Sequence, residues 1–156
     1  LGTLYERGLG VKADLARAQM WYQRAAEQGH VKAMHNLAVL SAGRGSGHPD
    51  YTTAATWFGK AAEYGLADSQ FNLAVLHENG LGVAKDPVRA LKWYSLAGQG
   101  GDAEALRRRD ALKSQVTADQ RFAADRDVAS FEAKRTVSLV NDARVAGEDW
   151  KKRQDG

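Results

Sequence analysis

Apolar positions recur along this chain with the spacing of paired amphipathic helices. Residues 67–79 carry apolar side chains at helical spacing on two faces of a predicted first helix. Residues 80–83 read Gly-Leu-Gly-Val, in which the glycines permit a tight turn and the valine can anchor the loop. Asp86-Pro87 then has the N-cap and first-turn pattern of a second helix, which we expect over residues 87–99. The pattern predicts a helix-turn-helix unit.

This unit repeats with a period of 36 residues. Trp21, Trp57 and Trp93 are separated by that interval (57−21 and 93−57). Self-similarity at such a period is typical of solenoids, in which each helical pair packs against its neighbours. The sequence therefore predicts an all-α fold, an α-solenoid of stacked repeats. The same interval relates four further sets of positions: Ala18, Ala54 and Ala90; Asp14, Asp50 and Asp86; Gly29, Gly65 and Gly101; and Leu1, Leu37 and Leu73.

The chain divides into a repeat array and a differently built C-terminal part. Residues 1–101 hold 10 basic and 8 acidic side chains, which leaves 12 of the 22 basic and 11 of the 19 acidic side chains in the remaining third. We expect residues 116–156 to form a capping helix and an extended tail. The array is expected over residues 1–112, with a truncated first repeat at 1–30, repeats at 31–66 and 67–101, and a half repeat at 102–115.

The residues from Thr117 to Gln120 have the spacing of a capping box. They predict a helix over roughly residues 118–134 that closes the open end of the solenoid, because terminal units need a polar outer face. Its inward-facing side chains are expected to be Phe122, Ala129 and either Phe131 or Ala133.

Both ends of the chain suggest further contacts. Leu1 is equivalent to Leu37 and Leu73, which fall in the middle of predicted helices, so we expect a longer protein with any membrane anchor upstream of Leu1. The tail is too polar for a core of its own. We expect it to fold back and to dock Trp150 or Leu139 against the repeat helices.

Composition argues against several kinds of chemistry. The chain has no cysteine, which rules out disulfides and thiolate metal sites, and its net charge of +3 is too small to predict a nucleic-acid partner. Its four histidines lack metal-binding spacing, and no serine has the context of a nucleophile. No apolar run reaches the roughly 18 residues of a membrane span. The sequence therefore predicts a protein that is not an enzyme and has no cofactor or metal.

One turn departs from the repeat pattern. Residues 44–47 read Arg-Gly-Ser-Gly where the other repeats have Gly-Leu-Gly-Val. The segment from Gly43 to His48 is either a turn that has lost its apolar anchors or a loop that cradles an anion, and both interpretations stay open.

The repeated aromatic residues are expected to form the core. Each tryptophan is followed by Tyr22, Phe58 or Tyr94, and such pairs can fill the space between successive units. Trp57→Ala is therefore predicted to cost about 3–5 kcal/mol of stability. Function is expected on residues that do not repeat.

Besides the loop at residues 44–48 and the tail to Trp150, such residues fall on the first helix of each unit. If the first helices line the inside of the solenoid, Val39, Phe71 and Val75 form an apolar strip bordered by charges. This composition suits a bound peptide anchored by one or two apolar side chains. Filling of the strip by the tail, or ordinary packing between helices, explains it equally well. The predicted groove residues are Lys32, His35, Val39, Asp68, Phe71, Val75, Glu78, Glu104 and Arg107.

The string Leu-Gly-x-Leu-Tyr-x-x-Gly-x-Gly-Val-x-x-Asp-x-x-x-Ala-x-x-Trp-Tyr-x-x-Ala-Ala-x-x-Gly, from Leu1 to Gly29, resembles the Sel1-like repeat, a relative of the tetratricopeptide repeat. The resemblance continues through residues 31–66 and 67–101. It implies a non-enzymatic scaffold for protein–protein interaction.

A narrower resemblance is carried by Ala-x-His-Asn-Leu-Ala-Val-Leu at residues 33–40 and by the stretch at residues 50–73. These strings are similar to the C-terminal periplasmic region of alphaproteobacterial polarity factors of the PodJ type. That resemblance implies a periplasmic domain of an inner-membrane protein that organises a cell pole and binds a protein or peptide of the bacterial envelope. The alternatives are a periplasmic regulator that binds a sensor kinase and a module that binds peptidoglycan.

Overall fold

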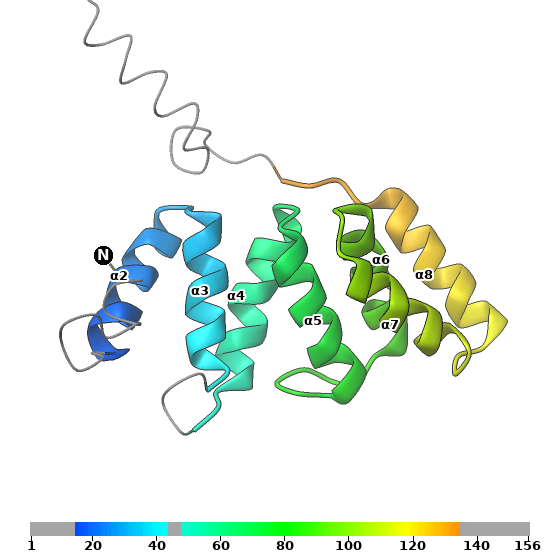
Figure 1. Ribbon diagram of the computed structural model, residues 1–156, viewed down its shortest axis with the longest axis horizontal. Coiled ribbons are helices and arrows are strands. Elements are labelled where there is room, and N and C mark those ends of the chain that lie inside the picture. Colours follow the sequence, from blue (N-terminus) through cyan, green and yellow to red (C-terminus); the bar gives the residue numbers. More distant parts are fainter. Residues whose placement is uncertain (1–14, 44–47, 135–156) are drawn as a thin grey trace, which may run out of the picture.

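The computed structural model describes residues 15–43 and 48–134, and within these residues it contains seven helices and no strand. Figure 1 shows the helices side by side in one row, with short turns between them. The predicted all-α solenoid is therefore confirmed. The helices are α2 (Leu15–Glu27), α3 (Val31–Ser41), α4 (Tyr51–Glu63), α5 (Ala67–Asn79), α6 (Pro87–Gln99), α7 (Ala103–Lys113) and α8 (Ala118–Ser130).

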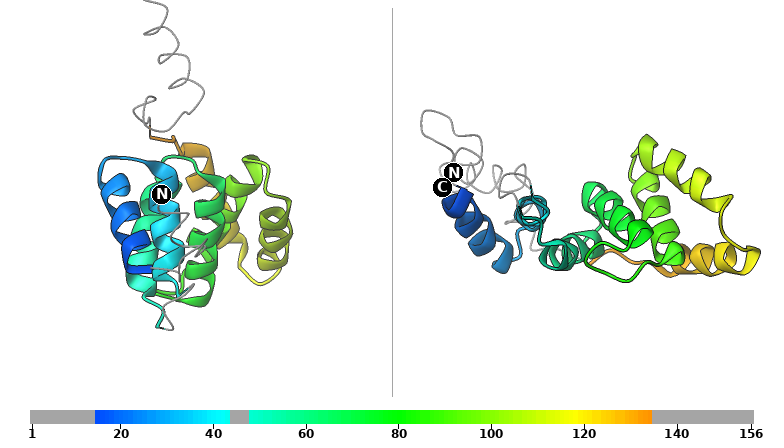
Figure 2. Two further views of the ribbon diagram at one scale, coloured as in Figure 1. Left: turned by 60° about the vertical axis from the view of Figure 1, so that its left-hand side comes forward. Right: turned by 90° about the horizontal axis from the view of Figure 1, so that it is seen from below.

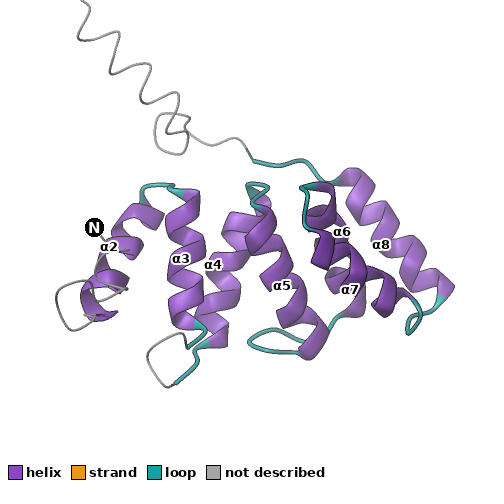
Figure 3. Ribbon diagram, in the orientation of Figure 1, coloured by secondary structure: helices purple, strands orange, loops and turns teal. Residues whose placement is uncertain are grey.

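Each helix from α2 to α6 packs against the next one along the chain, which gives two layers. Figure 3 shows α3, α5 and α7 in front of α4 and α6, and Figure 2 shows the same row from two further sides. We call α3, α5 and α7 the first helices of their units and α2, α4 and α6 the second helices. The last helix, α8, packs against α6.

The repeated small residues bring the helices together. Ala18, Ala54 and Ala90 are all fully buried, because a methyl group is the largest side chain that the closely approaching helices admit. The turn after each second helix carries the repeated glycine, and Gly65 and Gly101 have positive φ values of 89° and 104° that favour glycine. The 36-residue period thus fixes both the approach of the helices and the turns between units.

Polar caps set where the helices begin. The Asp50 and Asp86 carboxylates accept hydrogen bonds from the N–H groups of Thr53 and Arg89, at 3.0 and 3.1 Å. Asp102 caps α7 in the same way. The bounds of α5 and α6 are those that the sequence predicts: a glycine follows the end of each helix, and Asp86 with Pro87 marks the start of α6, whereas α5 starts without a side-chain cap.

The tryptophans are not equally buried, which corrects the expectation that all three belong to the core. Trp93 is 4 % exposed, Trp57 is half-buried and Trp21 is 38 % exposed. Trp57 and Trp93 lie between consecutive second helices, whereas no described second helix precedes the one that carries Trp21. We therefore expect Trp57→Ala to cost less stability than Trp93→Ala. Their chain neighbours Tyr22, Phe58 and Tyr94 are buried in all three repeats.

The helix at the C-terminal end differs from its prediction in length and in orientation. Its capping box, formed by Thr117 and Gln120, is confirmed, but the helix ends at Ser130 rather than near residue 134. Phe122 is 70 % exposed and Ala129 is exposed, so neither faces inward. The face toward the core is formed by Ala124, Val128 and Phe131, which follow one another at i, i+4 and i+7, so the prediction is confirmed for Phe131 alone of the three.

Residues 131–134, which we call the strap, leave α8 and run back across the second helices. Figure 1 shows the strap crossing from α8 toward α4. The Lys134 backbone N–H donates a hydrogen bond of 2.8 Å to the carbonyl oxygen of Glu63 at the end of α4. The expected docking of Trp150 or Leu139 lies outside the described residues. The turn at residues 44–47, which departs from the repeat pattern, lies outside them too.

Candidate functional site

The predicted groove residues occupy equivalent places on the first helices. Positions 32, 68 and 104 form one row across α3, α5 and α7, and positions 35, 71 and 107 form a second row, because each row repeats every 36 residues. The first row is exposed and carries Lys32, Asp68 and Glu104. The layer of first helices therefore presents one basic and two acidic side chains to solvent in a single row.

His35 joins two of the first helices. Its Nδ1 atom lies 2.8 Å from the hydroxyl oxygen of Ser69, which is fully buried on α5. Its ring stands 5.5 Å from the ring of Phe58 on α4. Burial lowers the pKa of His35, and the nearby Asp68 carboxylate opposes part of that shift. His35 is thus a neutral, half-buried link between units as well as a member of the second row.

The apolar strip is partly used by packing within the molecule. The Phe71 ring meets the Tyr94 ring edge-on at 5.8 Å, and the Arg108 guanidinium lies 5.2 Å from the centre of the Phe71 ring. Val39 and Val75 are half-buried and pack against the core. The strip therefore offers partly exposed apolar surface, not a row of fully exposed side chains.

Polar side chains border the apolar strip at its C-terminal end. The Tyr94 hydroxyl donates a hydrogen bond of 3.1 Å to a Glu78 carboxylate oxygen, and the nearby Arg108 guanidinium opposes part of the shift in the Tyr94 pKa. Burial raises the pKa of Tyr94 to about 12, so the hydroxyl keeps its proton and remains a donor. The sequence predicts Tyr94 as a core residue but not as a hydrogen-bond donor, since the equivalent residue one repeat earlier is Phe58, and it does not point to Arg108.

The predicted groove residues on α7 bind each other. Glu104 accepts hydrogen bonds from Arg107 and Arg108, and these bonds lower the pKa of its carboxyl group. Both arginines remain exposed, so their pairing with Glu104 contributes little to stability. These charges are accessible to a partner.

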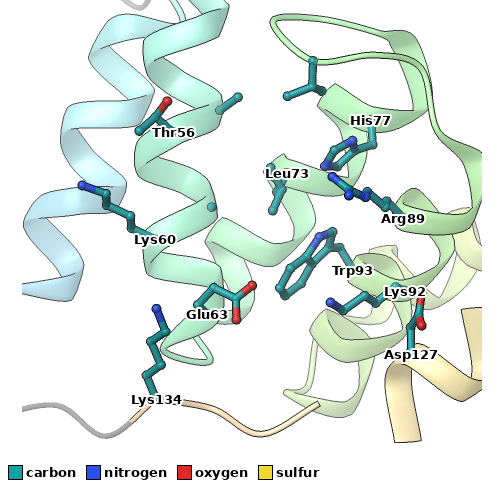
Figure 4. Close-up of a pocket in the computed structure, with 13 residues that line it drawn as sticks. Thr56, Lys60, Glu63, Leu73, His77, Arg89, Lys92, Trp93, Asp127 and Lys134 are labelled. Carbon is teal, nitrogen blue, oxygen red and sulfur yellow. The ribbon is translucent and has the colours of Figure 1, made fainter. Parts of the chain in front are cut away.

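A separate cavity of about 640 Å³ lies between α4 and α6, on the other layer, and Figure 4 shows the side chains around it. We call it the α4–α6 cavity. Trp93 forms one wall, and the charged residues Lys60, Glu63, Arg89, Lys92, Asp127 and Lys134 surround it. His77, 6 % exposed, lies at its inner wall, and the His77 Nδ1 atom has no hydrogen-bond partner among the described residues. None of the predicted groove residues lines this cavity.

The described residues hold no cluster of three or more His, Cys, Asp or Glu side chains that could bind a metal ion. In the same part of the chain, every helix is too short or too polar to cross a membrane.

Stability is expected to fall as the pH drops from about 7.5 to about 5.5. Burial lowers the pKa values of His35 and His77 below the ordinary 6.5, and Arg89 and Lys92 lower that of His77 further while Asp86 opposes them. As the pH falls, these two histidines therefore take up protons at a higher pH in the unfolded chain than in the folded chain. Stability is complete above pH 6.5 and is lost as the pH falls through the lowered folded-state values.

Urea denaturation at both pH values measures this loss. Replacing both histidines by glutamine should make the urea midpoint less dependent on pH over this range. An equally steep dependence in the double variant would contradict the assignment to His35 and His77.

Comparisons with known proteins agree with this geometry. The Sel1 repeat family matches residues 1–30, 31–65 and 67–102. A solved Sel1 repeat protein from Oxalobacter formigenes is 37 % identical over 69 % of this chain and 44 % of its own, with a TM-score of 0.64. Another solved structure is c5321, a protective antigen of uropathogenic Escherichia coli strains with an SLR fold. It is 25 % identical over 97 % of this chain and 39 % of its own, with a TM-score of 0.55.

The chain thus spans less than half the length of either solved structure. A search of curated proteins finds no match. Sel1 repeats generally mediate protein–protein interactions, and proteins built from them are typically non-enzymatic scaffolds.

Proposed function

Because the chain belongs to the Sel1 repeat family, we propose that it is a non-enzymatic scaffold whose first-helix layer binds an extended segment of a partner protein. The observation that carries this proposal is the aligned rows on α3, α5 and α7. Repeat register places Lys32, Asp68 and Glu104 in one exposed row beside the partly exposed apolar strip. An apolar strip with a charged border provides both an anchor and a means to select the partner.

The border has both signs of charge, which favours a partner with mixed charges. Lys32 and Arg107 can meet carboxylates, whereas Asp68 can meet a lysine or arginine of the partner. Phe71 and Val75 lie beside these charges and offer apolar contact area. The partner segment that fits is therefore amphipathic, with one or two apolar side chains between charged ones.

The narrower proposal is a periplasmic scaffold that organises proteins at a bacterial cell pole, with its membrane anchor upstream of Leu1. Its support is the similarity of residues 33–40 and 50–73 to PodJ-type polarity factors. A periplasmic regulator of a sensor kinase and a peptidoglycan-binding module are the alternatives. The full-length reading frame separates the first two, since a coiled coil and a membrane span upstream favour the polarity factor and a cleavable signal peptide favours the regulator. Retention on purified peptidoglycan above that of an unrelated protein favours the third.

Charge reversal in the exposed row is expected to abolish partner capture without affecting the fold. Lys32→Glu combined with Asp68→Lys changes two exposed side chains, so the melting temperature should stay the same. Val75→Glu should weaken capture as well, because it places a carboxylate in the apolar strip. The measurement is quantitative affinity capture from a bacterial envelope extract with the immobilised wild-type and variant chains.

The matched control is Phe122→Glu, which alters an exposed apolar side chain on α8, away from the rows. It should capture the same partners as the wild type. If the charge-reversed and Val75→Glu variants captured every wild-type partner undiminished, the first-helix layer would not be the binding surface.

A further inference from the structure

The strap shows how the layer of second helices holds an extended chain. Phe131 leaves α8 with an extended backbone, and its ring meets the Trp93 ring edge-on at 5.6 Å. The Lys92 ammonium lies 4.4 Å from the Trp93 ring centre and 5.8 Å from that of Phe131, so it makes cation–π contacts with both rings. The strap is thus anchored by an aromatic side chain at its start.

The other end of the strap is fixed through its backbone. The Lys134 N–H group donates to the Glu63 carbonyl oxygen, at the end of the preceding second helix. The strap also passes directly over Gly65, since a Cβ atom placed there would lie 3.2 Å from the Ala133 side chain. An aromatic anchor on a tryptophan, followed by a main-chain hydrogen bond beside a glycine, is therefore the mode of binding.

The repeat provides the same three positions one unit earlier. Subtracting 36 from Trp93, Glu63 and Gly65 gives Trp57, Glu27 and Gly29. All three line a single cavity of about 430 Å³ between α2 and α4. We call it the α2–α4 cavity, and no described residue fills it. Its other lining residues are Ala26, Met34, Lys60, Tyr64 and Lys134.

The chemistry of this cavity resembles that of the strap site. The Lys60 ammonium lies 4.5 Å from the centre of the half-buried Trp57 ring, as Lys92 does at Trp93. Met34, almost fully buried, adds apolar surface beside it. An aromatic side chain placed against Trp57 would therefore meet both an aromatic edge and a cation.

The charge of the cavity favours acidic residues next to the aromatic side chain of a bound segment. Lys60 and Lys134 both line the cavity, against the single carboxylate of Glu27. Charge complementarity therefore favours acidic residues in the bound segment.

We propose that the α2–α4 cavity binds an extended segment of a partner protein, in which an aromatic side chain is followed by acidic residues. The aromatic ring packs on Trp57 beside Lys60, and a backbone N–H group of the segment donates to the Glu27 carbonyl. The acidic side chains face Lys60 and Lys134. This surface shares no residue with the rows on the first helices, so the scaffold has two separate sites for extended segments.

The probe is a fluorescein-labelled peptide, Ser-Phe-Glu-Ala-Glu-Glu, which keeps the first four residues from Ser130 and replaces the basic residues after them by acids. Fluorescence anisotropy with the full chain should show saturable binding. A peptide with alanine in place of phenylalanine should bind at least about tenfold more weakly, and Lys60→Glu should weaken binding by about tenfold. Lys60→Arg should retain it.

Two matched variants separate this site from other effects. Lys113→Glu makes the same charge change on α7, outside the cavity, and should bind the peptide like the wild type. Asp68→Lys, in the exposed row of the first helices, should also leave peptide binding unchanged. If the peptide does not bind the α2–α4 cavity, the proposal for the first-helix layer still stands. If the first-helix layer captures no partner, the proposal for the cavity still stands.

The position of the peptide decides the proposal. A photoreactive benzoylphenylalanine in place of its phenylalanine should form adducts within residues 24–34 or 57–64. Adducts on α6 or on the strap would show that the peptide replaces the strap instead, and would overturn the proposal. No saturable binding, or binding only after residues 135–156 are deleted, would overturn it too, since the second result assigns the cavity to the chain's own tail.

Discussion

Trp93→Ala is expected to lower the free energy of unfolding by about 3–5 kcal/mol. The ring is 4 % exposed and contacts Phe131 of the strap and Lys92 of its own helix. Its removal leaves a void between α4 and α6 and also frees the strap, so the loss combines buried area with lost aromatic contacts.

The same substitution at the equivalent positions gives a matched series. Trp21 is 38 % exposed, so Trp21→Ala should cost about 1 kcal/mol or less, and Trp57→Ala should fall between the two. Urea denaturation followed by circular dichroism measures all three. Equal losses along the series would contradict the unequal burial of the tryptophans.

Gly82→Ala is expected to cost about 2–5 kcal/mol, from backbone strain and a steric clash together. Gly82 has a φ of 70°, which alone costs about 1–2 kcal/mol for a residue with a side chain. An added Cβ atom would lie 2.2 Å from the carbonyl oxygen of Tyr51 and 2.6 Å from the nitrogen of Thr52. Both atoms belong to the backbone at the start of α4, so they cannot move aside as a flexible side chain would.

Gly101→Ala separates the two causes. Gly101 also has a positive φ, of 104°, but no described atom lies within 4 Å of an added Cβ. It should show only the conformational cost of about 1–2 kcal/mol. If Gly82→Ala and Gly101→Ala lost the same stability in urea, the close approach of the 80–83 turn to α4 would carry no energetic weight.

The solenoid could be predicted from the sequence because its determinants are local and repeated. Asp86 with Pro87 fixes the start of α6, and the glycines at 80 and 100 follow the ends of α5 and α6. The inward face of α8 could not be predicted in this way. Two sets of apolar positions share a helical spacing there, one through Phe122 and one through Ala124, and only contact with α6 selects the second.

The rows of the candidate site follow from the repeat, since a 36-residue period determines which positions are equivalent. The contacts around these rows do not follow from the repeat. Arg108 reaches Phe71 and Tyr94 through a long side chain, and nothing in the period marks it rather than its neighbour Arg107. The strap could not be predicted from the repeat either, because its hydrogen bond from Lys134 to Glu63 joins residues far apart in the sequence.

The central claim, that partners bind the first-helix layer, is tested most directly by site-specific photo-crosslinking. A photoreactive residue is placed in turn at the exposed positions 32 and 68 and, as a control, at position 122 on α8. The account predicts that the captured partner is cross-linked from positions 32 and 68 and not from position 122. Cross-links from position 122 with none from positions 32 and 68 would contradict it.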